Sequence, residues 1–184
     1  MRATTHAIIC RLLILMLLLA TPAWADQIGL SPPTSQVRLR AYGLGFLPLD
    51  GKFTRFHGWM RYEPSNPAAC QVILEIEASS LAMESGLTRE QITGPDFMDA
   101  ARFPDLAFTG GCQGNTAVGS LTLHGQTHPF TLNLDRSARS IVATGQLRRA
   151  DWGITSHPLM GGSTIRIQVE LPDPLVVPRP GSHT

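Results

Sequence analysis

The sequence predicts a mainly β protein, built as an antiparallel sandwich or barrel. Apolar and polar residues alternate with period two in several segments, which is the pattern of strands with one buried face. The chain is also rich in turn-forming residues, with 17 glycines and 14 prolines among 184 residues. Only one segment, around residues 88–101, carries helical signals instead. Short strands separated by turns in this way are typical of β-sandwiches and β-barrels.

The first 25 residues predict a secretion signal. Arg2 and Arg11 accompany an unbroken apolar run over residues 12–20, and Ala23 and Ala25 supply the small residues that a signal peptidase recognises. A helix of that run rises only about 14 Å, which is too short to cross a hydrocarbon core of about 30 Å. We therefore expect cleavage after Ala25 and export of the remaining chain.

Alternating segments recur from residue 37 onwards, and each predicts a strand with one apolar face. The clearest covers residues 72–78, in which apolar residues at every second position alternate with Ile73, Glu75 and Glu77. The apolar residues of these segments are Val37, Leu39 and Ala41; Val72, Leu74, Ile76 and Ala78; Phe130, Leu132 and Leu134; Ile141, Ala143, Gly145 and Leu147; and Ile165, Ile167, Val169 and Leu171.

Residues 52–62 are rich in aromatic and basic side chains, and we expect them to form one strand. By period two, Phe53, Arg55, His57, Trp59 and Arg61 then share a face. That face is either part of a core with a solvated rim, or the wall of a tunnel with a basic mouth. A tunnel of the second kind suits an apolar ligand with an anionic or polar head.

Residues 86–103 break the alternation. The run from Thr88 to Gln91 matches a capping box that opens a short helix, and Gly94 followed by Pro95 ends it. Asp96 caps a second turn that reaches Ala101. We therefore expect a short helical segment around residues 88–101, followed by a strand over residues 106–109.

Cys70 and Cys112 remain once the signal is removed, and an even count in an exported chain favours a disulfide. If the strands over 72–78 and 106–109 are antiparallel, the two cysteines face each other. The alternatives are two unconnected small residues or a metal site, which is disfavoured because neither cysteine has a partner two residues away. A bridge closing a loop of about 43 residues stabilises the fold by roughly 4 kcal/mol.

Composition and charge exclude two broad classes of protein. With 15 basic and 14 acidic residues the net charge is +1, so the chain offers no electrostatic footprint for nucleic acid. A hydrophobic content of 43% excludes a disordered chain. We expect one domain over residues 26–171, followed by an extended, proline-rich tail over residues 172–184.

The polar residues offer little catalytic chemistry. His124 and His128 flank a turn, which places both at one end of a barrel. A small hydrolase-like enzyme that uses His124, His128 and Asp151 as acid–base groups is the alternative to a binding protein, and it requires these three side chains to converge. A metal centre needs three or four converging ligands, so we expect neither a metal site nor a catalytic residue set.

Four blocks of sequence resemble the YceI-like family. The run over residues 96–108 is similar to the D-F-[FL]-D and [FY]-P-x-[IA]-x-F elements of that family. Residues 118–130 resemble its V-x-G-x-L-x-[LI]-x-G-x-[TK]-x-P hairpin, residues 149–154 its R-x-D-[FW]-G segment, and residues 50–58 its G-x-F-x-x-F-x-G strand. The four blocks keep the family's order and spacing over roughly residues 35–171.

This resemblance implies a lipocalin-like antiparallel β-barrel whose elongated apolar interior holds a long-chain isoprenoid, such as a polyprenyl phosphate or a quinone-like lipid. About eight strands enclose a lumen sized for one such ligand. We therefore expect a periplasmic, non-enzymatic carrier with no cofactor other than a bound polyisoprenoid lipid. A transient inner-membrane partner and a homodimer are compatible with this function. The residues expected to line the lumen are Val37, Leu39, Phe53, Trp59, Val72, Leu74, Ile76, Phe108, Leu121, Phe130 and Leu132.

Overall fold

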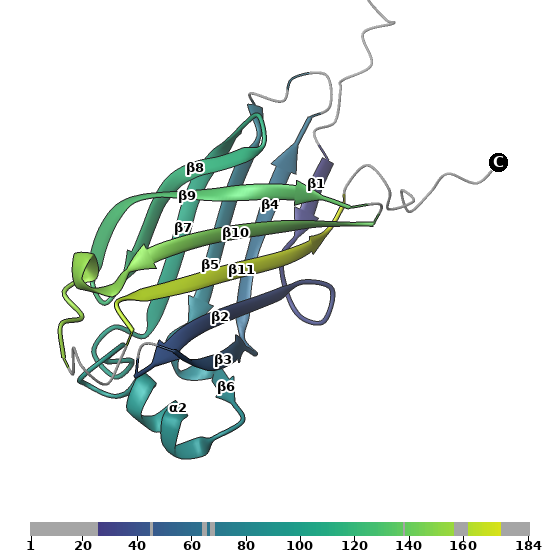
Figure 1. Ribbon diagram of the computed structural model, residues 1–184. Helices are drawn as coiled ribbons and strands as arrows, with labels where there is room; N and C mark the ends of the chain where they lie inside the picture. Colours follow the sequence, from purple (N-terminus) through teal and green to yellow (C-terminus); the bar gives the residue numbers. More distant parts are fainter. Residues whose placement is uncertain are drawn as a thin grey trace, which may run out of the picture.

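The computed structural model describes residues 26–44, 46–63, 66, 69–137, 139–156 and 162–173. The predicted signal over residues 1–25, its cleavage site and the tail beyond residue 173 lie outside the described residues. The described chain forms one curled antiparallel sheet of eleven strands (Figure 1), in the order β1-β4-β5-β7-β8-β9-β10-β11-β2-β3-β6. The strands are β1 (Asp26–Gly29), β2 (Gln36–Gly43), β3 (Leu47–Phe53), β4 (Phe56–Tyr62), β5 (Gln71–Glu77), β6 (Leu81–Met83), β7 (Asp105–Gln113), β8 (Thr116–Leu123), β9 (Gln126–Arg136), β10 (Ser140–Arg148) and β11 (Thr164–Pro172).

The lipocalin-like β fold predicted from the sequence is confirmed, but the expected count of about eight strands is wrong. The additional strands are β1, β3 and β6. β1 and β6 have only four and three residues, too few to show a period-two pattern. β3 carries Pro48 and Gly51, two residue types that are depleted in strands, so its sequence does not indicate a strand.

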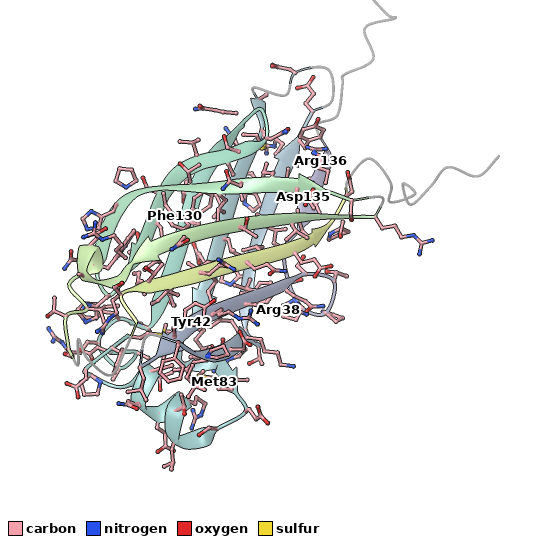
Figure 2. All side chains as sticks on the ribbon, in the orientation of Figure 1. Arg38, Tyr42, Met83, Phe130, Asp135 and Arg136 are labelled. Carbon is pink, nitrogen blue, oxygen red and sulfur yellow. A yellow bond between two sulfur atoms is a disulfide. The ribbon has the colours of Figure 1, made fainter. Side chains whose placement is uncertain are left out.

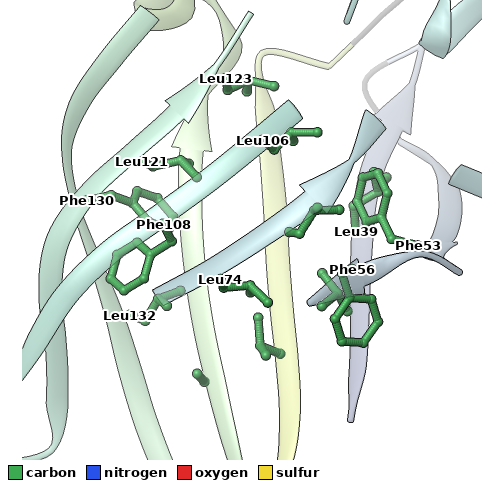
Figure 3. Packing of buried hydrophobic residues seen from close by; sticks show 14 of the residues in the cluster. Leu39, Phe53, Phe56, Leu74, Leu106, Phe108, Leu121, Leu123, Phe130 and Leu132 are labelled. Carbon is green, nitrogen blue, oxygen red and sulfur yellow. The ribbon is translucent and has the colours of Figure 1, made fainter. Parts of the chain in front are cut away.

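The sheet curls because strands from opposite ends of the chain pair with each other. β11 lies antiparallel to β2, with Ile167 opposite Leu39 and Val169 opposite Val37. Both strands alternate with period two, so this register puts the apolar residues of both on the same, inner face. Figure 3 shows the result, with labelled side chains of β2, β3, β4, β5, β7, β8 and β9 directed into the interior.

A sharp bend between β3 and β4 brings the two ends of the sheet together. The backbone N–H of Thr54 donates to the carbonyl of Ser80 at 3.1 Å, and the N–H of Glu77 donates to the carbonyl of Arg55 at 3.1 Å. The chain therefore changes its partner between these two residues, from the β6 side at Thr54 to β5 at Arg55, and the inward parity changes with it, because Phe53 and Phe56 are both buried. The expectation of one continuous strand over residues 52–62 is wrong for this reason.

The helix α2 (Gly86–Thr93) lies at one end of the sheet, beneath β3 and β6 (Figure 1). It begins earlier than the sequence suggested, because the hydroxyl of Ser85 accepts the N–H of Thr88 at 3.2 Å and so caps the helix in place of Thr88. It ends before Gly94 and Pro95 as expected, and the residues that follow form turns without a second helix. No helix in the described ranges is long and apolar enough to cross a membrane.

A disulfide joins Cys70 to Cys112, as predicted, with 5.3 Å between the two Cα atoms. The cysteines meet because β5 and β7 pair antiparallel with Gln71 opposite Gly111. The bridge thus ties the start of β5 to a point near the end of β7, at the end of the barrel away from α2.

Candidate functional site

The curled sheet encloses an apolar cavity of about 160 Å³, which we call the lumen cavity. Its walls come from the inner faces of β2, β3, β5, β7, β8, β9, β10 and β11, and α2 with the turns after it covers one end. The lining residues are Val37, Leu39, Ala41, Tyr42, Leu49, Phe53, Leu74, Ile76, Thr88, Gln91, Ile92, Phe97, Met98, Leu106, Phe108, Leu121, Leu123, Phe130, Leu132, Leu147, Arg149, Ile154, Gly162, Ile165, Ile167 and Val169.

A second, smaller cavity of about 40 Å³ continues the lumen toward the disulfide. Leu74, Phe108, Leu132 and Val169 line both cavities, so these four side chains form the constriction between them. Cys112 is among the residues that line the smaller cavity on its far side. The interior is therefore elongated along the barrel.

The lumen cavity reaches the surface at α2. Gln91 of this helix is the exposed residue among the described lining residues, and Thr88 is half-buried. Tyr42, at the end of β2, also lines the cavity and lies near α2, whereas Asp135 and Arg136 lie toward the opposite end of the barrel (Figure 2). We call the opening at α2 the mouth.

One basic residue, Arg149, lines the cavity close to the mouth. It follows β10, whose buried residues alternate as Ile141, Ala143, Gly145 and Leu147, so Arg149 occupies the next inward position. Only 5% of Arg149 is exposed. Its side chain donates to the carbonyl of Ser156 at 2.7 Å, and its Cζ lies 5.3 Å from the centre of the Phe97 ring. Loss of hydration lowers the pKa of Arg149 from its usual value, because burial penalises the charged form.

Nine of the eleven expected residues line the lumen cavity: Val37, Leu39, Phe53, Leu74, Ile76, Phe108, Leu121, Phe130 and Leu132. Figure 3 shows Leu39 and Phe53 on one side of the interior and Phe108, Phe130 and Leu132 on the other. Val72 also lies on the inner side but contributes to the smaller cavity.

Trp59 does not lie in the lumen, so that prediction is wrong. It alternates with the buried residues of β4, and its ring lies on the outer side under the guanidinium of Arg61, whose Cζ is 5.3 Å from the ring centre. The cause is the bend at residues 54 and 55. Odd-numbered residues such as Phe53 point inward before the bend, and odd-numbered residues such as Trp59 point outward after it.

Sequence reasoning missed many of the lining residues, and three groups of them show the reasons. β11 contributes Ile165, Ile167 and Val169. Their alternation is plain in the sequence, but they were not among the residues expected to line the lumen. Arg149 was detectable as the next inward position after β10. Phe97 and Met98 lie in turns, where no periodicity marks a residue as buried, so tertiary packing alone places them.

His124, His128 and Asp151 surround Trp152 at one end of the barrel and do not converge on one another. The Nδ1 atom of His124 lies 3.1 Å from the Trp152 carbonyl, and the His128 ring lies edge-on to the Trp152 ring, with 5.1 Å between their centres. Asp151 is exposed, and none of the three lines the lumen cavity. Within the described residues no hydrogen bond or ion pair joins either histidine to Asp151, and no cluster of three metal-ligating side chains is present.

Comparison with known proteins agrees with this geometry. The YceI-like domain model matches residues 29–172. A UPF0312 protein of Vibrio cholerae is 30% identical over 107 residues, which are 55% of this chain and 57% of that protein, so the match spans little more than half of the relative. A UPF0312 protein of Vibrio vulnificus is 27% identical over 170 residues, covering 82% of this chain and 88% of the relative.

Solved structures show the same fold at low sequence identity. BcnA of Burkholderia cenocepacia superposes with a TM-score of 0.63 at 18% identity, over 76% of this chain and 96% of that one. A polyisoprenoid-binding domain from Saccharophagus degradans, implicated in plant cell wall breakdown, gives a TM-score of 0.57 at 14% identity, over 80% and 97% of the two chains. The curled sheet with its apolar lumen and the match over residues 29–172 lead to one conclusion: this chain belongs to the YceI-like family.

Proposed function

We propose that this protein is an exported, non-enzymatic carrier that holds the tail of an isoprenoid or quinone-like lipid in the lumen cavity. The observation that carries the proposal is the cavity itself, which is lined almost entirely by aliphatic and aromatic side chains and opens at one end. The neighbour from Saccharophagus degradans, described as polyisoprenoid-binding, supports the same class of ligand. Export is proposed on the ground of the predicted signal in the first 25 residues, and the periplasm is the proposed location.

The energetics of an empty cavity support a ligand-binding role. The side chains that line this cavity of about 160 Å³ lack packing partners on its inner side, and closed empty cavities in protein cores cost about 24 cal/mol per Å³. A lipid tail offsets the cost, because each methylene that it buries stabilises the complex by about 0.8 kcal/mol.

The volume of the lumen cavity limits how much of a long lipid tail it can hold. An apolar core cavity of about 150 Å³ binds a single benzene ring, so the lumen cavity as it stands takes about that much of a lipid. A longer tail passes the constriction formed by Leu74, Phe108, Leu132 and Val169 and enters the smaller cavity, or it extends through the mouth. We therefore propose that these four side chains change rotamer when the ligand is a long isoprenoid.

The mouth carries exposed apolar side chains that suit lipid exchange. Leu44, Phe46 and Leu47 at the tip of the β2–β3 hairpin and Leu87 of α2 are 51–81% exposed. The transient inner-membrane partner expected from the sequence would meet this rim, because a tail that passes directly from a membrane into the mouth avoids water. The homodimer stays a prediction.

Lipid uptake by two matched tryptophan variants tests the proposal. Leu74→Trp fills the constriction from inside, whereas Val118→Trp adds the same side chain on the outer face of β8. We expect Leu74→Trp to bind geranylgeraniol at least about tenfold more weakly than the wild type, at little cost in stability, and Val118→Trp to bind it normally. Binding is measured by titration of delipidated protein.

Two outcomes would contradict the proposal. Normal binding by Leu74→Trp would place the lipid outside the lumen. Large destabilisation of Leu74→Trp would show a solid core that cannot accept added volume.

Native mass spectrometry of the protein purified from its own periplasm, followed by organic extraction, tests occupancy and export together. A co-purifying isoprenoid would identify the ligand directly.

A further inference from the structure

The outer face of β11, β2 and β3 carries a group of exposed basic side chains. They alternate with the inward residues of these strands, so they share the outer side of the sheet. The residues are Arg38, Arg40, Lys52 and Arg166, and we call them the basic face. Arg40 donates two hydrogen bonds to the carboxylate of Asp50, at 2.6 and 2.8 Å. Among the described residues, no ion pair joins the other three to an acidic side chain.

The register of the sheet places like charges of the basic face opposite each other. Arg166 lies directly opposite Arg40, and Lys52 lies directly opposite Arg38. Arg38 also donates to the uncharged side chain of Gln36. Like charges at opposite positions of neighbouring strands destabilise a sheet, whereas the chain as a whole is nearly neutral, with a net charge of +1. A surface of opposite charge would offset this local repulsion.

The hairpin formed by β2 and β3 ends at the mouth in exposed apolar side chains. Phe46 is 75% exposed, and Leu44 and Leu47 are more than half exposed; we call these three residues the apolar tip. Leu44 has a φ angle of 51°, a left-handed conformation in which glycine is less strained than leucine. Leu87 of α2, which is 81% exposed, lies one helical turn before Gln91 at the same end of the barrel (Figure 1). Exposed apolar side chains gathered in this way mark a binding surface.

We propose that the β2–β3 hairpin docks the mouth on an anionic lipid bilayer, with the apolar tip among the acyl chains and the basic face against the negative head groups. Apolar anchors combined with basic residues are the features that hold proteins at such an interface. The charged heads belong to the bilayer, so the lipid held in the lumen needs no charge. The proposal rests on the proposed function in one respect, that the docked mouth admits a lipid tail.

Binding to two kinds of vesicle tests the charge part of the proposal. One kind contains phosphatidylcholine alone, and the other contains equal parts of phosphatidylcholine and phosphatidylglycerol. We expect the chain without its predicted signal to bind the anionic vesicles at least about tenfold more tightly in co-sedimentation, because each basic residue near such a surface contributes about fivefold. Added salt should reduce this preference, since it screens exposed charges.

Two double variants of equal net charge locate the contact. Lys52→Gln with Arg166→Gln removes two charges from the basic face, and we expect binding to anionic vesicles to fall at least about tenfold. Arg61→Gln with Arg139→Gln removes two exposed charges near the opposite end of the barrel, and we expect a change of less than about twofold. Equal losses in the two double variants would show that net charge alone governs binding, and would overturn the docking surface.

Tryptophan fluorescence tests whether the apolar tip enters the bilayer. In Phe46→Trp we expect the emission to shift to shorter wavelength when anionic vesicles are added, because the added ring leaves water. Val118→Trp, on the outer face of β8, is the control and should show no shift. The absence of a shift in Phe46→Trp would mean that the tip stays in water, and would refute the proposed insertion.

The outcomes separate this inference from the proposed function. Geranylgeraniol binding in solution is measured beside vesicle binding, and we expect the Lys52→Gln, Arg166→Gln double variant to bind this lipid as the wild type does. If the wild type binds geranylgeraniol but shows no preference for anionic vesicles, the carrier function stands and the bilayer is not the partner of the hairpin. If it prefers anionic vesicles but binds no geranylgeraniol, the docking surface stands and the carrier function fails.

Discussion

At the scale of single residues, glycine sets how closely the strands of this barrel approach one another. Gly110 of β7 lies directly opposite Gly119 of β8. A Cβ atom built on Gly119 would lie 2.2 Å from the carbonyl oxygen of Thr109 and 2.6 Å from the Cα of Gly110. Both are backbone atoms and cannot rotate away, so any side chain at position 119 pushes the two strands apart.

We expect Gly119→Ala to destabilise the protein by about 2 kcal/mol or more, because overpacking against backbone strains the ladder. The measurement is the midpoint of urea unfolding for the chain without its predicted signal. Gly29→Ala is the control, since a Cβ at Gly29 meets nothing within 4 Å, and we expect it to change stability by less than about 0.5 kcal/mol. Equal effects of the two substitutions would contradict the steric argument.

At the scale of the elements, an ion pair closes the corner where the ends of the sheet meet. The guanidinium of Arg55, in the bend before β4, donates from two nitrogens to the carboxylate of Glu77 at the end of β5. The hydroxyl of Ser79 donates to the same carboxylate at 2.6 Å. The hydrogen bonds from Arg55, and then that from Ser79, lower the pKa of Glu77 from 4.5 to about 2.

This shift predicts a pH dependence of stability. Between pH 4.5 and pH 2 the unfolded chain takes up a proton at Glu77 while the folded chain does not, so the contribution of this carboxylate is complete above about pH 4.5 and is lost as the pH falls toward 2. Glu77→Gln cannot titrate. We expect the wild type to be more stable than Glu77→Gln at pH 6, and the difference to vanish near pH 2.

Chemical unfolding at several pH values between 2 and 7 measures that difference. Glu84→Gln, at an exposed position between β6 and α2, is the control, and we expect no comparable trend for it. A stability gap between wild type and Glu77→Gln that stays constant with pH would show that the substitution acts through packing or hydrogen bonding and not through charge.

At the scale of the whole molecule, stability and ligand binding are linked through the lumen. A ligand that binds only the folded state stabilises it by about 2.7 kcal/mol when its free concentration is one hundred times its dissociation constant. We expect geranylgeraniol to raise the free energy of unfolding of the wild type by about this amount, and that of Leu74→Trp, which binds at least about tenfold more weakly, by about 1.4 kcal/mol or less at the same concentration. An equal rise in both proteins would indicate binding at the surface.

Local periodicity determined much of this fold from the sequence alone. Where apolar residues alternate without interruption, as over residues 72–78, 130–134 and 141–147, the strand and its inner face follow from the two-residue period of an extended chain. Nine of the eleven residues expected in the lumen line the cavity. The cysteine pair was predicted from the even cysteine count and the two strands beside it, and the family from four motifs in order. Arg149 also continues an inner face that the sequence displays.

Other features depend on contacts between residues that are distant in the sequence, and only the tertiary structure determines them. The bend at residues 54 and 55 forms where β3 meets β4, and hydrogen bonds to Ser80 and Glu77 hold it, so the outward position of Trp59 could not be obtained from residues 52–62 alone. Phe97 and Met98 enter the lumen from turns that have no period. The cavity is a property of the assembled sheet, because its volume depends on how the sheet curls and on which side chains meet across the interior. A sequence determines which face of a strand is apolar, whereas the distance between opposite faces is fixed only when all the strands are assembled.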